Sequence, residues 1–411
     1  MIYARLSLMM FLQFFIWGCW FVTMGSFLGA NFQATGAQSA LAYSTQSWGA
    51  IIAPFIIGLI ADRDFNAERI LGVLHLVGAA LMYMMFEAEN FTQFYPYVLG
   101  YMIAYMPTLA LVNSISFRQL TDPSKQFSFV RVWGTFGWVV AGGLISLVFD
   151  WDADEAIAQG ALRNTFMMGA VTSAVLALFS FTLPATPPTV DRSSGFSLRA
   201  ALGLDALKLL RDRNFLVFFI SSVLICIPLA FYYQNASLFL TEIGTTNSTG
   251  KLSIGQMSEM LFMLLLPLFL LRFGIKVTLL VGMLAWAVRY VLFAYGGQDN
   301  VAVLLITGIA LHGICYDFFF VSGQIFTDSK AGEHYRSAAQ GMITLATYGV
   351  GMLIGFSVAG AVSDHFNVDG KHDWFRIWLY PAGFAAAVMV LFALLFRRES
   401  ISYEGRRTRQ S

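Results

Sequence analysis

Long apolar stretches separated by short polar ones run along most of this 411-residue chain. A helix needs roughly 20 mostly apolar residues to cross the hydrocarbon core of a bilayer. Continuous apolar runs of about that length lie near residues 6–30, 41–61, 70–87, 94–117, 129–149, 163–184, 214–241, 253–271, 276–295, 300–327, 337–363 and 374–396. They lack the alternation of membrane β-strands. The pattern therefore predicts an all-α integral membrane protein with twelve transmembrane helices.

A polar stretch divides these runs into two sets of six, which predicts two six-helix bundles. We expect an N-terminal bundle over 1–184, a cytoplasmic linker over 185–213, a C-terminal bundle over 214–396 and a cytoplasmic tail over 397–411. The linker begins with proline, serine and glycine, and Leu198 to Leu210 has the pattern of a short amphipathic helix on the inner leaflet. Two joined bundles that rock around a central site are typical of secondary transporters.

The composition excludes an ordinary soluble protein. Hydrophobic residues make up 57% of the chain and charged residues only 12%, against about 25% charged in a soluble domain. The three cysteines, Cys19, Cys226 and Cys315, all lie in apolar runs, so neither a disulfide framework nor a zinc site is indicated. The first run is too long for a cleaved signal peptide, and we interpret it as a transmembrane helix.

The positions of the basic residues predict the orientation in the membrane. Most of the 25 Lys and Arg residues fall on one side if the N-terminus is cytoplasmic, in loops near 63–69, 118–125, 192–213, 272–276 and 330–336 and in the tail. The opposite loops are acidic or neutral. Because cytoplasmic loops carry the excess of positive charge, both termini are expected in the cytoplasm.

Three ionisable residues inside the predicted spans are candidates for function, because a charge in a membrane is costly. Asp317 lies in the middle of a span with no basic residue within one helical turn, and Glu259 lies three residues after Gln256 on the same helix face. Arg131 opens the fifth span. Desolvation disfavours a charged carboxylate, so Asp317 is the main candidate to carry a coupled proton and Glu259 is the second. The alternative is a structural ion pair or, for Arg131, a cytoplasmic anchor.

Aromatic and amide side chains near these groups suit a flat, polar, uncharged ligand such as a nucleobase or a sugar ring. The residues beside the candidate charges are Thr135, Trp138 and Tyr316, and a polar cluster follows Pro228 at Tyr232, Tyr233, Gln234 and Asn235. The cluster has an equally plausible structural role in hydrogen bonding between helices.

Other signals are weaker. His75 and His312 each suit a proton relay or a packing donor. The spacing of His365 and His372 fits no standard metal site, and a solvated loop is favoured. No Walker A or nucleophile-elbow sequence occurs, so neither an ATP-driven pump nor an enzyme is indicated, and no cofactor or nucleic-acid partner is expected.

The loop after the second run contains Gly58, Asp62 and Arg63 in the order Gly-x-x-x-Asp-Arg. This order resembles the signature of the major facilitator superfamily. The resemblance implies that the glycine lets helices approach closely and that the two charged residues hold the cytoplasmic side closed, as gating residues.

A wider resemblance covers nearly the whole chain and points to the nucleoside:proton symporter family of that superfamily. It rests on short segments in matching order, at 11–18, 104–109, 131–135, 203–206, 256–259, 272–276, 292–296, 317–319 and 338–341. The resemblance implies proton-coupled nucleoside uptake by alternating access across a bacterial cytoplasmic membrane, by a protein that functions as a monomer. It also implies ligand-binding positions at Arg131, Thr135, Trp138, Gln256, Glu259, Tyr316 and Asp317.

The seventh run departs from the family pattern. Where the family carries a Gln and an Asn three residues apart, this chain has Ala230 and Tyr233, and Gln234 and Asn235 stand near them as substitutes. The sequence therefore leaves open which nucleobase is preferred, and whether the substrate is instead another ribosyl compound or a sugar. A receptor that binds the ligand without moving it, or a membrane-embedded enzyme, is a more distant alternative.

Overall fold

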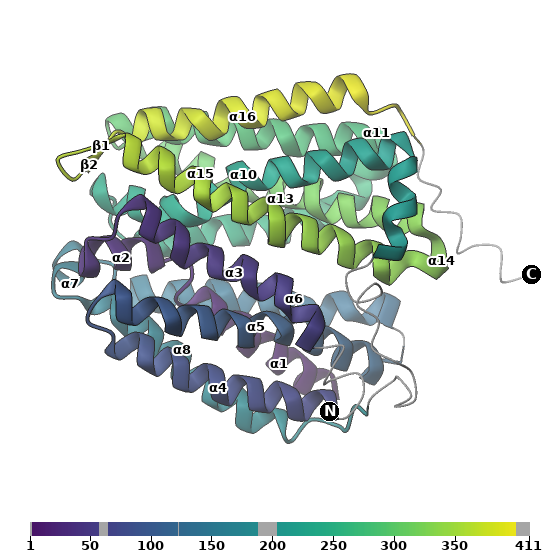
Figure 1. Ribbon diagram of the computed structural model, residues 1–411, viewed down its shortest axis with the longest axis horizontal. Coiled ribbons are helices and arrows are strands. Elements are labelled where there is room, and N and C mark those ends of the chain that lie inside the picture. Colours follow the sequence, from purple (N-terminus) through teal and green to yellow (C-terminus); the bar gives the residue numbers. More distant parts are fainter. Residues whose placement is uncertain (1, 57–64, 122, 188–203, 400–411) are drawn as a thin grey trace, which may run out of the picture.

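The computed structural model describes residues 2–56, 65–121, 123–187 and 204–399, and it is helical almost throughout (Figure 1). The first half contains α1 (Ile2–Gly18), α2 (Met24–Phe32), α3 (Gly36–Ile56), α4 (Ala67–Glu87), α5 (Phe91–Gln119), α6 (Pro123–Gly143), the π-helix η2 (Leu144–Val148), α7 (Asp154–Ala158), the 3-10 helix η3 (Ala161–Arg163) and α8 (Asn164–Ser180).

The second half contains the 3-10 helix η4 (Leu204–Arg211), α10 (Arg213–Glu242), α11 (Ser248–Gln298), α12 (Ala302–Ala310), α13 (His312–Tyr316), the π-helix η5 (Asp317–Val321), α14 (Ser322–Thr344), the π-helix η6 (Leu345–Gly351), α15 (Met352–His365) and α16 (Trp374–Leu395). The strands β1 (Asn367–Val368) and β2 (Lys371–His372) form an antiparallel hairpin between α15 and α16. We call residues 2–187 the N-half and residues 204–399 the C-half.

The helices have the length and apolarity of membrane spans. Within the described ranges, nine of them are candidates to cross a bilayer, and α1 is a shorter apolar helix. One candidate, α11, consists of two helices joined at Gly274, whose φ of 73° is a conformation that glycine adopts without strain. These findings confirm an all-α membrane protein, whereas the count of twelve spans stays a prediction.

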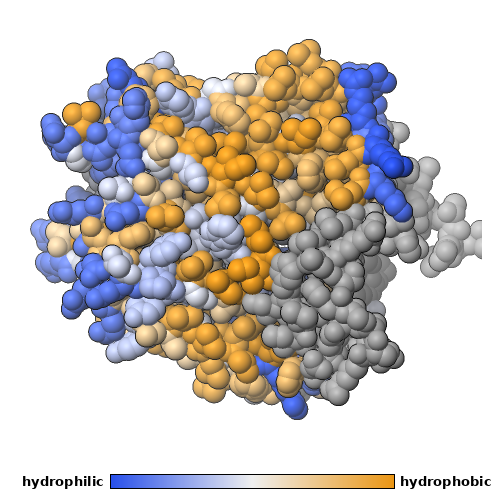
Figure 2. Space-filling view, viewed as in Figure 1, coloured by the Kyte–Doolittle hydropathy of each residue, from blue (hydrophilic) through white to orange (hydrophobic). Residues whose placement is uncertain are grey.

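The surface supports the same conclusion. Figure 2 shows a broad hydrophobic band across the middle of the visible face, with hydrophilic residues concentrated toward the ends. On α11, the side chains of Leu264, Leu268 and Leu271 are 76%, 64% and 74% exposed. Their spacing of about one helical turn forms an apolar stripe on one face, as lipid contact requires.

Three details differ from the sequence-based expectation. The first run is broken, because residues 19–23 form a turn between α1 and α2. The helix that carries Arg131 begins before the apolar run: α6 starts at Pro123, a residue whose fixed φ suits a first helical turn. Arg131 therefore lies about two turns inside the helix, although it is near the start of the candidate span Phe129–Val148. The linker helix is a 3-10 helix over Leu204–Arg211, and the expected residues 198–203 lie outside the described part.

Each half packs mainly within itself, as Figure 1 shows. In the N-half, α1 lies against α6 and α8, and α4 lies against α5 and α8; in the C-half, α11 lies against α12, α13 and α16. Glycine permits the closest approach of α1 and α6, since a Cβ on Gly137 would stand 2.3 Å from the carbonyl oxygen of Phe11. Close packing of this kind therefore lies inside each half.

The halves meet closely at the end of the molecule that carries α2, α7 and the β1–β2 hairpin, which we call the hairpin end (Figure 1). There Asp364 of the C-half accepts hydrogen bonds from the backbone N–H groups of Gly36 (2.5 Å) and Ala37 (2.8 Å) at the start of α3. Asp152 of the N-half accepts a bond from the N–H of Thr249 (2.8 Å) at the start of α11. Each half thus supplies a carboxylate to a helix N-terminus of the other, where the helix dipole favours negative charge.

Candidate substrate and proton site

A pocket lies between the two halves, next to the hairpin-end contact at Thr249. Its lining comes from α1 and the turn after it, α6, α10 and α11, and it includes three of the predicted site residues, Trp138, Tyr233 and Gln256. The other lining residues are Gly18, Val22, Gly142, Tyr232, Thr249, Leu252 and Ser253. The pocket therefore combines aromatic faces with hydroxyl and amide groups.

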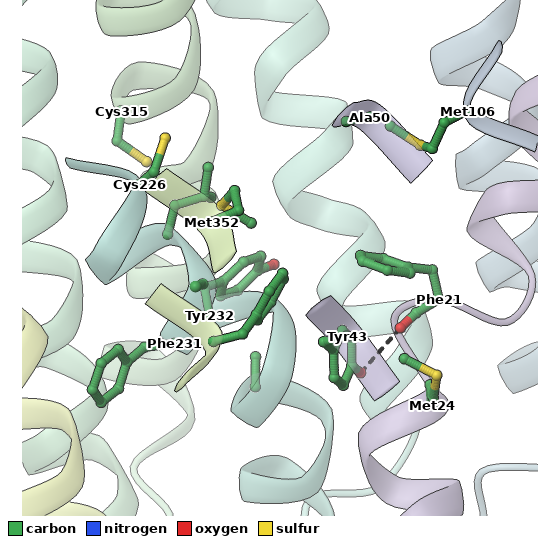
Figure 3. Close-up of a cluster of buried hydrophobic side chains, with 14 of the residues drawn as sticks. Phe21, Met24, Tyr43, Ala50, Met106, Cys226, Phe231, Tyr232, Cys315 and Met352 are labelled. Carbon is green, nitrogen blue, oxygen red and sulfur yellow. Dashed lines mark hydrogen bonds between the residues drawn. The ribbon is translucent and has the colours of Figure 1, made fainter. Parts of the chain in front are cut away.

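Aromatic rings from both halves surround this pocket. The ring of Trp17 lies 5.5 Å from that of Trp138 and 5.7 Å from that of Tyr105, and Phe21 lies 5.6 Å from Tyr233 across the boundary between halves. Figure 3 shows buried side chains of both halves in this region, with Phe21 and Tyr43 from the N-half and Phe231 and Tyr232 from the C-half. Trp17 was not predicted as a site residue, although it lies in a segment that carries the family resemblance.

The predicted residues of α6 share one face of that helix. Arg131, Thr135 and Trp138 are spaced by four and three residues, so their side chains are stacked along the helix. The guanidinium of Arg131 lies 4.0 Å above the ring of Phe14, and it is close enough to interact electrostatically with Glu259 on α11. The structure therefore brings the α6 candidates and the α11 candidates toward the same region.

Glu259 is buried and lies against α13. Its side chain is 10% exposed, and its Oε2 atom stands 3.9 Å from Nε2 of His312. Gly313 makes this approach possible: a Cβ there would be 2.6 Å from the backbone nitrogen of Glu259, and the Gly313 N–H donates to the hydroxyl of Ser258. Glycine at this position therefore determines how closely the acid and the histidine can lie.

Asp317 is fully buried, and neither carboxylate oxygen has a hydrogen-bond partner among the described residues. It begins the π-helical segment η5, a type of local irregularity that is frequent at functional sites. The preceding residue, Tyr316, shares a 2.6 Å hydrogen bond with the hydroxyl of Tyr348 in the second π-helical segment, η6. A buried carboxylate without donors is costly as an anion, and a bound proton removes that cost.

Arg289 is a buried charge that the sequence analysis did not single out. Its side chain is fully buried, its Nη1 atom lies 2.9 Å from Nδ1 of His312, and its guanidinium lies 3.6 Å above the ring of Tyr232. The sequence did contain the signal, since an arginine inside an apolar run deserves the same weight as Arg131. Arg289, His312 and Glu259 thus form a continuous row of polar groups.

The polar cluster on α10 divides between two roles. Tyr233 lines the pocket, whereas the amide of Asn235 donates to the hydroxyl of Ser363 on α15 (3.1 Å). Gln234 is buried between α10, α3 and α15, with its amide 3.4 Å from the carbonyl oxygen of Gly36. These contacts favour a role between helices for Gln234 and Asn235, the alternative that the sequence left open.

The weaker candidates also have places in the structure. His75 is buried in a network in which its ring nitrogens contact Ser173 (3.0 Å) and Gln13 (2.8 Å), as a packing residue does. His372 bonds to Glu242 at the hairpin end. Across the residues that the structure describes, no group of three or more His, Cys, Asp or Glu could hold a metal ion. The proposed gating residues, Gly58, Asp62 and Arg63, lie outside the described residues.

Comparison with known proteins identifies the family. The family described as "Nucleoside H+ symporter" matches residues 1–400. The chain belongs to this family. It is 42% identical to the "Putative nucleoside transporter YegT" of Escherichia coli (strain K12), over 96% of this chain and 93% of that protein. It is 34% identical to the xanthosine permease of the same organism, over 96% of this chain and 95% of that protein.

A solved structure supports the assignment. The chain matches a crystal structure of the nucleoside transporter NupG with a TM-score of 0.84 at 30% identity, over 97% of this chain and 100% of that one. This member of the nucleoside H+ symporter family is therefore a transporter of the major facilitator fold and not an enzyme. Its apolar helices make it a multi-pass protein of the inner membrane.

Proposed function

We propose that this symporter carries nucleosides and protons together into the cell by alternating access. In the proposed form it has twelve spans, in bundles over 1–184 and 214–396 joined by a cytoplasmic linker, with both termini and the 397–411 tail in the cytoplasm. It works as a monomer and needs no cofactor. The hairpin end then faces outward, and the contacts there close the outer side.

The observation that carries the proposal is the set of aromatic and polar residues that line the pocket between the halves. The free volume of this pocket is only about 10 Å³ in the described conformation, so the halves have to separate before a nucleoside can enter. A nucleoside has a flat base, which suits the faces of Trp138 and Tyr233, and hydroxyl and amide groups, which suit Gln256. We assign Arg131, Thr135, Glu259, Tyr316 and Asp317 to the same site. Gln234 and Asn235 support it from between the helices.

Proton coupling is assigned to Asp317, with Glu259 as a second acid. None of the residues that the structure describes donates a hydrogen bond to Asp317, so the protonated form suits this conformation. The two acids are near enough to interact electrostatically, and two neighbouring anions in a membrane repel each other. A proton therefore stabilises the buried site, and substrate binding and proton binding favour the same conformation.

Substrate class is tested by uptake of labelled uridine into proteoliposomes, with unlabelled adenosine, xanthosine, ribose and glucose as competitors. We expect the nucleosides to compete and the sugars not to. Gln256→Ala should raise the KM for uridine about tenfold, as loss of one or two hydrogen bonds predicts. Gln159→Ala, an exposed residue at the hairpin end, is the control. If glucose or ribose competes and the nucleosides do not, the substrate is a sugar and the proposed nucleoside transport is wrong.

A further inference from the structure

Arg289 lies in an unusual setting for a charged residue. It is fully buried in the C-half, and the described part of the chain offers its Nε and Nη2 atoms no hydrogen-bond partner. Its Nη1 atom lies 2.9 Å from Nδ1 of His312 and 3.6 Å from the sulfur of Cys315, and its guanidinium lies 3.6 Å from the centre of the Tyr232 ring. A buried charge held in this way is expensive, and a function for it is expected.

The contact with His312 determines which ring nitrogen carries the proton. An arginine side chain donates hydrogen bonds and never accepts them, so Nδ1 of His312 must be the acceptor. A proton on Nδ1 would remove that bond and place an imidazolium beside the guanidinium. The ring proton therefore belongs on Nε2, the nitrogen that points away from Arg289.

Neighbouring rings fix the orientation of His312. The imidazole stacks on Tyr232 with 5.3 Å between centroids and lies 5.7 Å from the ring of Tyr316. In this orientation Nε2 stands 3.9 Å from Oε2 of Glu259, too far for a hydrogen bond. The two atoms therefore do not hydrogen-bond to each other in this conformation. Both residues lie beside the pocket lining, since Glu259 is one helical turn from Gln256 and His312 stacks on Tyr232.

We infer that Arg289 is a positioning residue, which holds His312 in the Nε2–H tautomer so that a hydrogen-bond donor stands beside the acceptor Glu259 in the substrate site. The inference rests on the proposed function of that site. The pair recognises a ligand group that offers an acceptor and a donor side by side. In a nucleoside, both the two ribose hydroxyls and the lactam edge of the base have this chemistry.

The tautomer is measured directly by NMR of protein labelled with ¹⁵N-histidine, in which the His312 signals are those lost in His312→Gln. We expect unprotonated Nδ1 and protonated Nε2 in the wild type at pH 7. Arg289→Lys retains a donor and should retain this state, whereas Arg289→Met should give a mixture of states. The control, Arg163→Met, removes a half-buried arginine of the N-half and should leave His312 unchanged. An Nδ1–H tautomer or an imidazolium in the wild type overturns the inference, even if Arg289→Met fails to fold.

Transport separates positioning from a general structural role. Arg289→Met should raise the KM for uridine about tenfold, and Arg289→Lys should recover most of the loss. In a His312→Gln background, Arg289→Met should cause no further increase in KM, because the residue acts through His312. A second, fully additive increase would overturn the inference. If the wild type moves no nucleoside, the proposed function fails, but the NMR result still tests the role of Arg289.

The two sources of ligand chemistry are separated by analogues. The wild type should prefer uridine over 2′-deoxyuridine and 3′-deoxyuridine if His312 contacts the ribose, and over 3-methyluridine if His312 contacts the base edge. His312→Phe, which cannot donate, should lose one of these two preferences. If both preferences persist unchanged in His312→Phe, His312 does not contact the ligand, and the inference is refuted.

Discussion

Asp364→Asn removes the charge from a carboxylate that holds the two halves together at the hairpin end. The wild-type carboxylate accepts the N–H groups of both Gly36 and Ala37, one on each oxygen. An asparagine has a single oxygen, so one N–H would face an NH₂ group instead. These bonds join the halves and exist only while the hairpin end is closed, so the change should favour opening of that end.

The magnitude follows from the bonds lost. A hydrogen bond to a charged group contributes about 1.5–3 kcal/mol, and a charge at a helix N-terminus about 0.3–1 kcal/mol. Because Asp364 is only half-buried, solvent screening reduces this sum, and we expect a net effect of about 1–2 kcal/mol. That free energy shifts the ratio of closed to open hairpin ends by about tenfold. Asp152→Asn acts on separate partners, so the double variant should shift the ratio by about a hundredfold.

The assay is electron–electron distance measurement between nitroxide labels at Glu155→Cys and Lys371→Cys, two exposed positions on opposite halves. The three native cysteines are buried and should label poorly. We expect a larger fraction of long distances in Asp364→Asn and a still larger fraction in the double variant. The control, Asp369→Asn, removes an exposed carboxylate from the same end. Unchanged distances in the double variant, or an equal change in the control, would refute the reasoning.

Two further predictions concern stability. Gly313→Ala should lower the melting temperature, and lower the free energy of unfolding by about 1–3 kcal/mol, because its Cβ would lie 2.5 Å from the backbone of Ser258. The control in the same thermal unfolding assay is Gly383→Ala, whose Cβ would meet open space, and equal melting temperatures for the two variants would contradict the packing argument. Burial opposes ionisation of Asp212, but the N–H of Phe215 and the ammonium of Lys330 outweigh it and hold the pKa of Asp212 below its usual value. The ionised Asp212 therefore stabilises the fold at neutral pH, and this stabilisation is lost as the pH falls through the lowered pKa. Asp212→Asn should lower the melting temperature at pH 7 and have less effect below about pH 4. A destabilisation that grows on acidification would contradict this role of Asp212.

The sequence predicted the membrane class and singled out candidate site residues because the bilayer makes both signals strong. A charge in an apolar run is conspicuous, which is how Asp317 and Glu259 were selected. Their neighbours followed from helical spacing, and Trp138 and Gln256 indeed line the pocket. The same rule selected Arg131 but was not applied to Arg289, so one buried charge and the role of His312 were missed.

Other features could not be predicted because their partners carry no sequence signal. Asp152 and Asp364 bind backbone N–H groups of the opposite half, which every residue except proline possesses, so nothing in the sequence marks these partners. Adjacent residues on a helix point about 100° apart. For this reason Tyr233 lines the pocket while Gln234 and Asn235, next to it in the chain, contact other helices.

The central claim is that a proton on Asp317 drives nucleoside uptake. The most direct measurement compares wild type and Asp317→Asn in proteoliposomes, for uridine accumulation driven by an inward proton gradient and for uridine counterflow without a gradient. We expect the wild type to accumulate uridine until a protonophore is added, and the variant to lose accumulation but retain counterflow. Wild-type accumulation by Asp317→Asn, or accumulation that a protonophore leaves unchanged, would contradict the account.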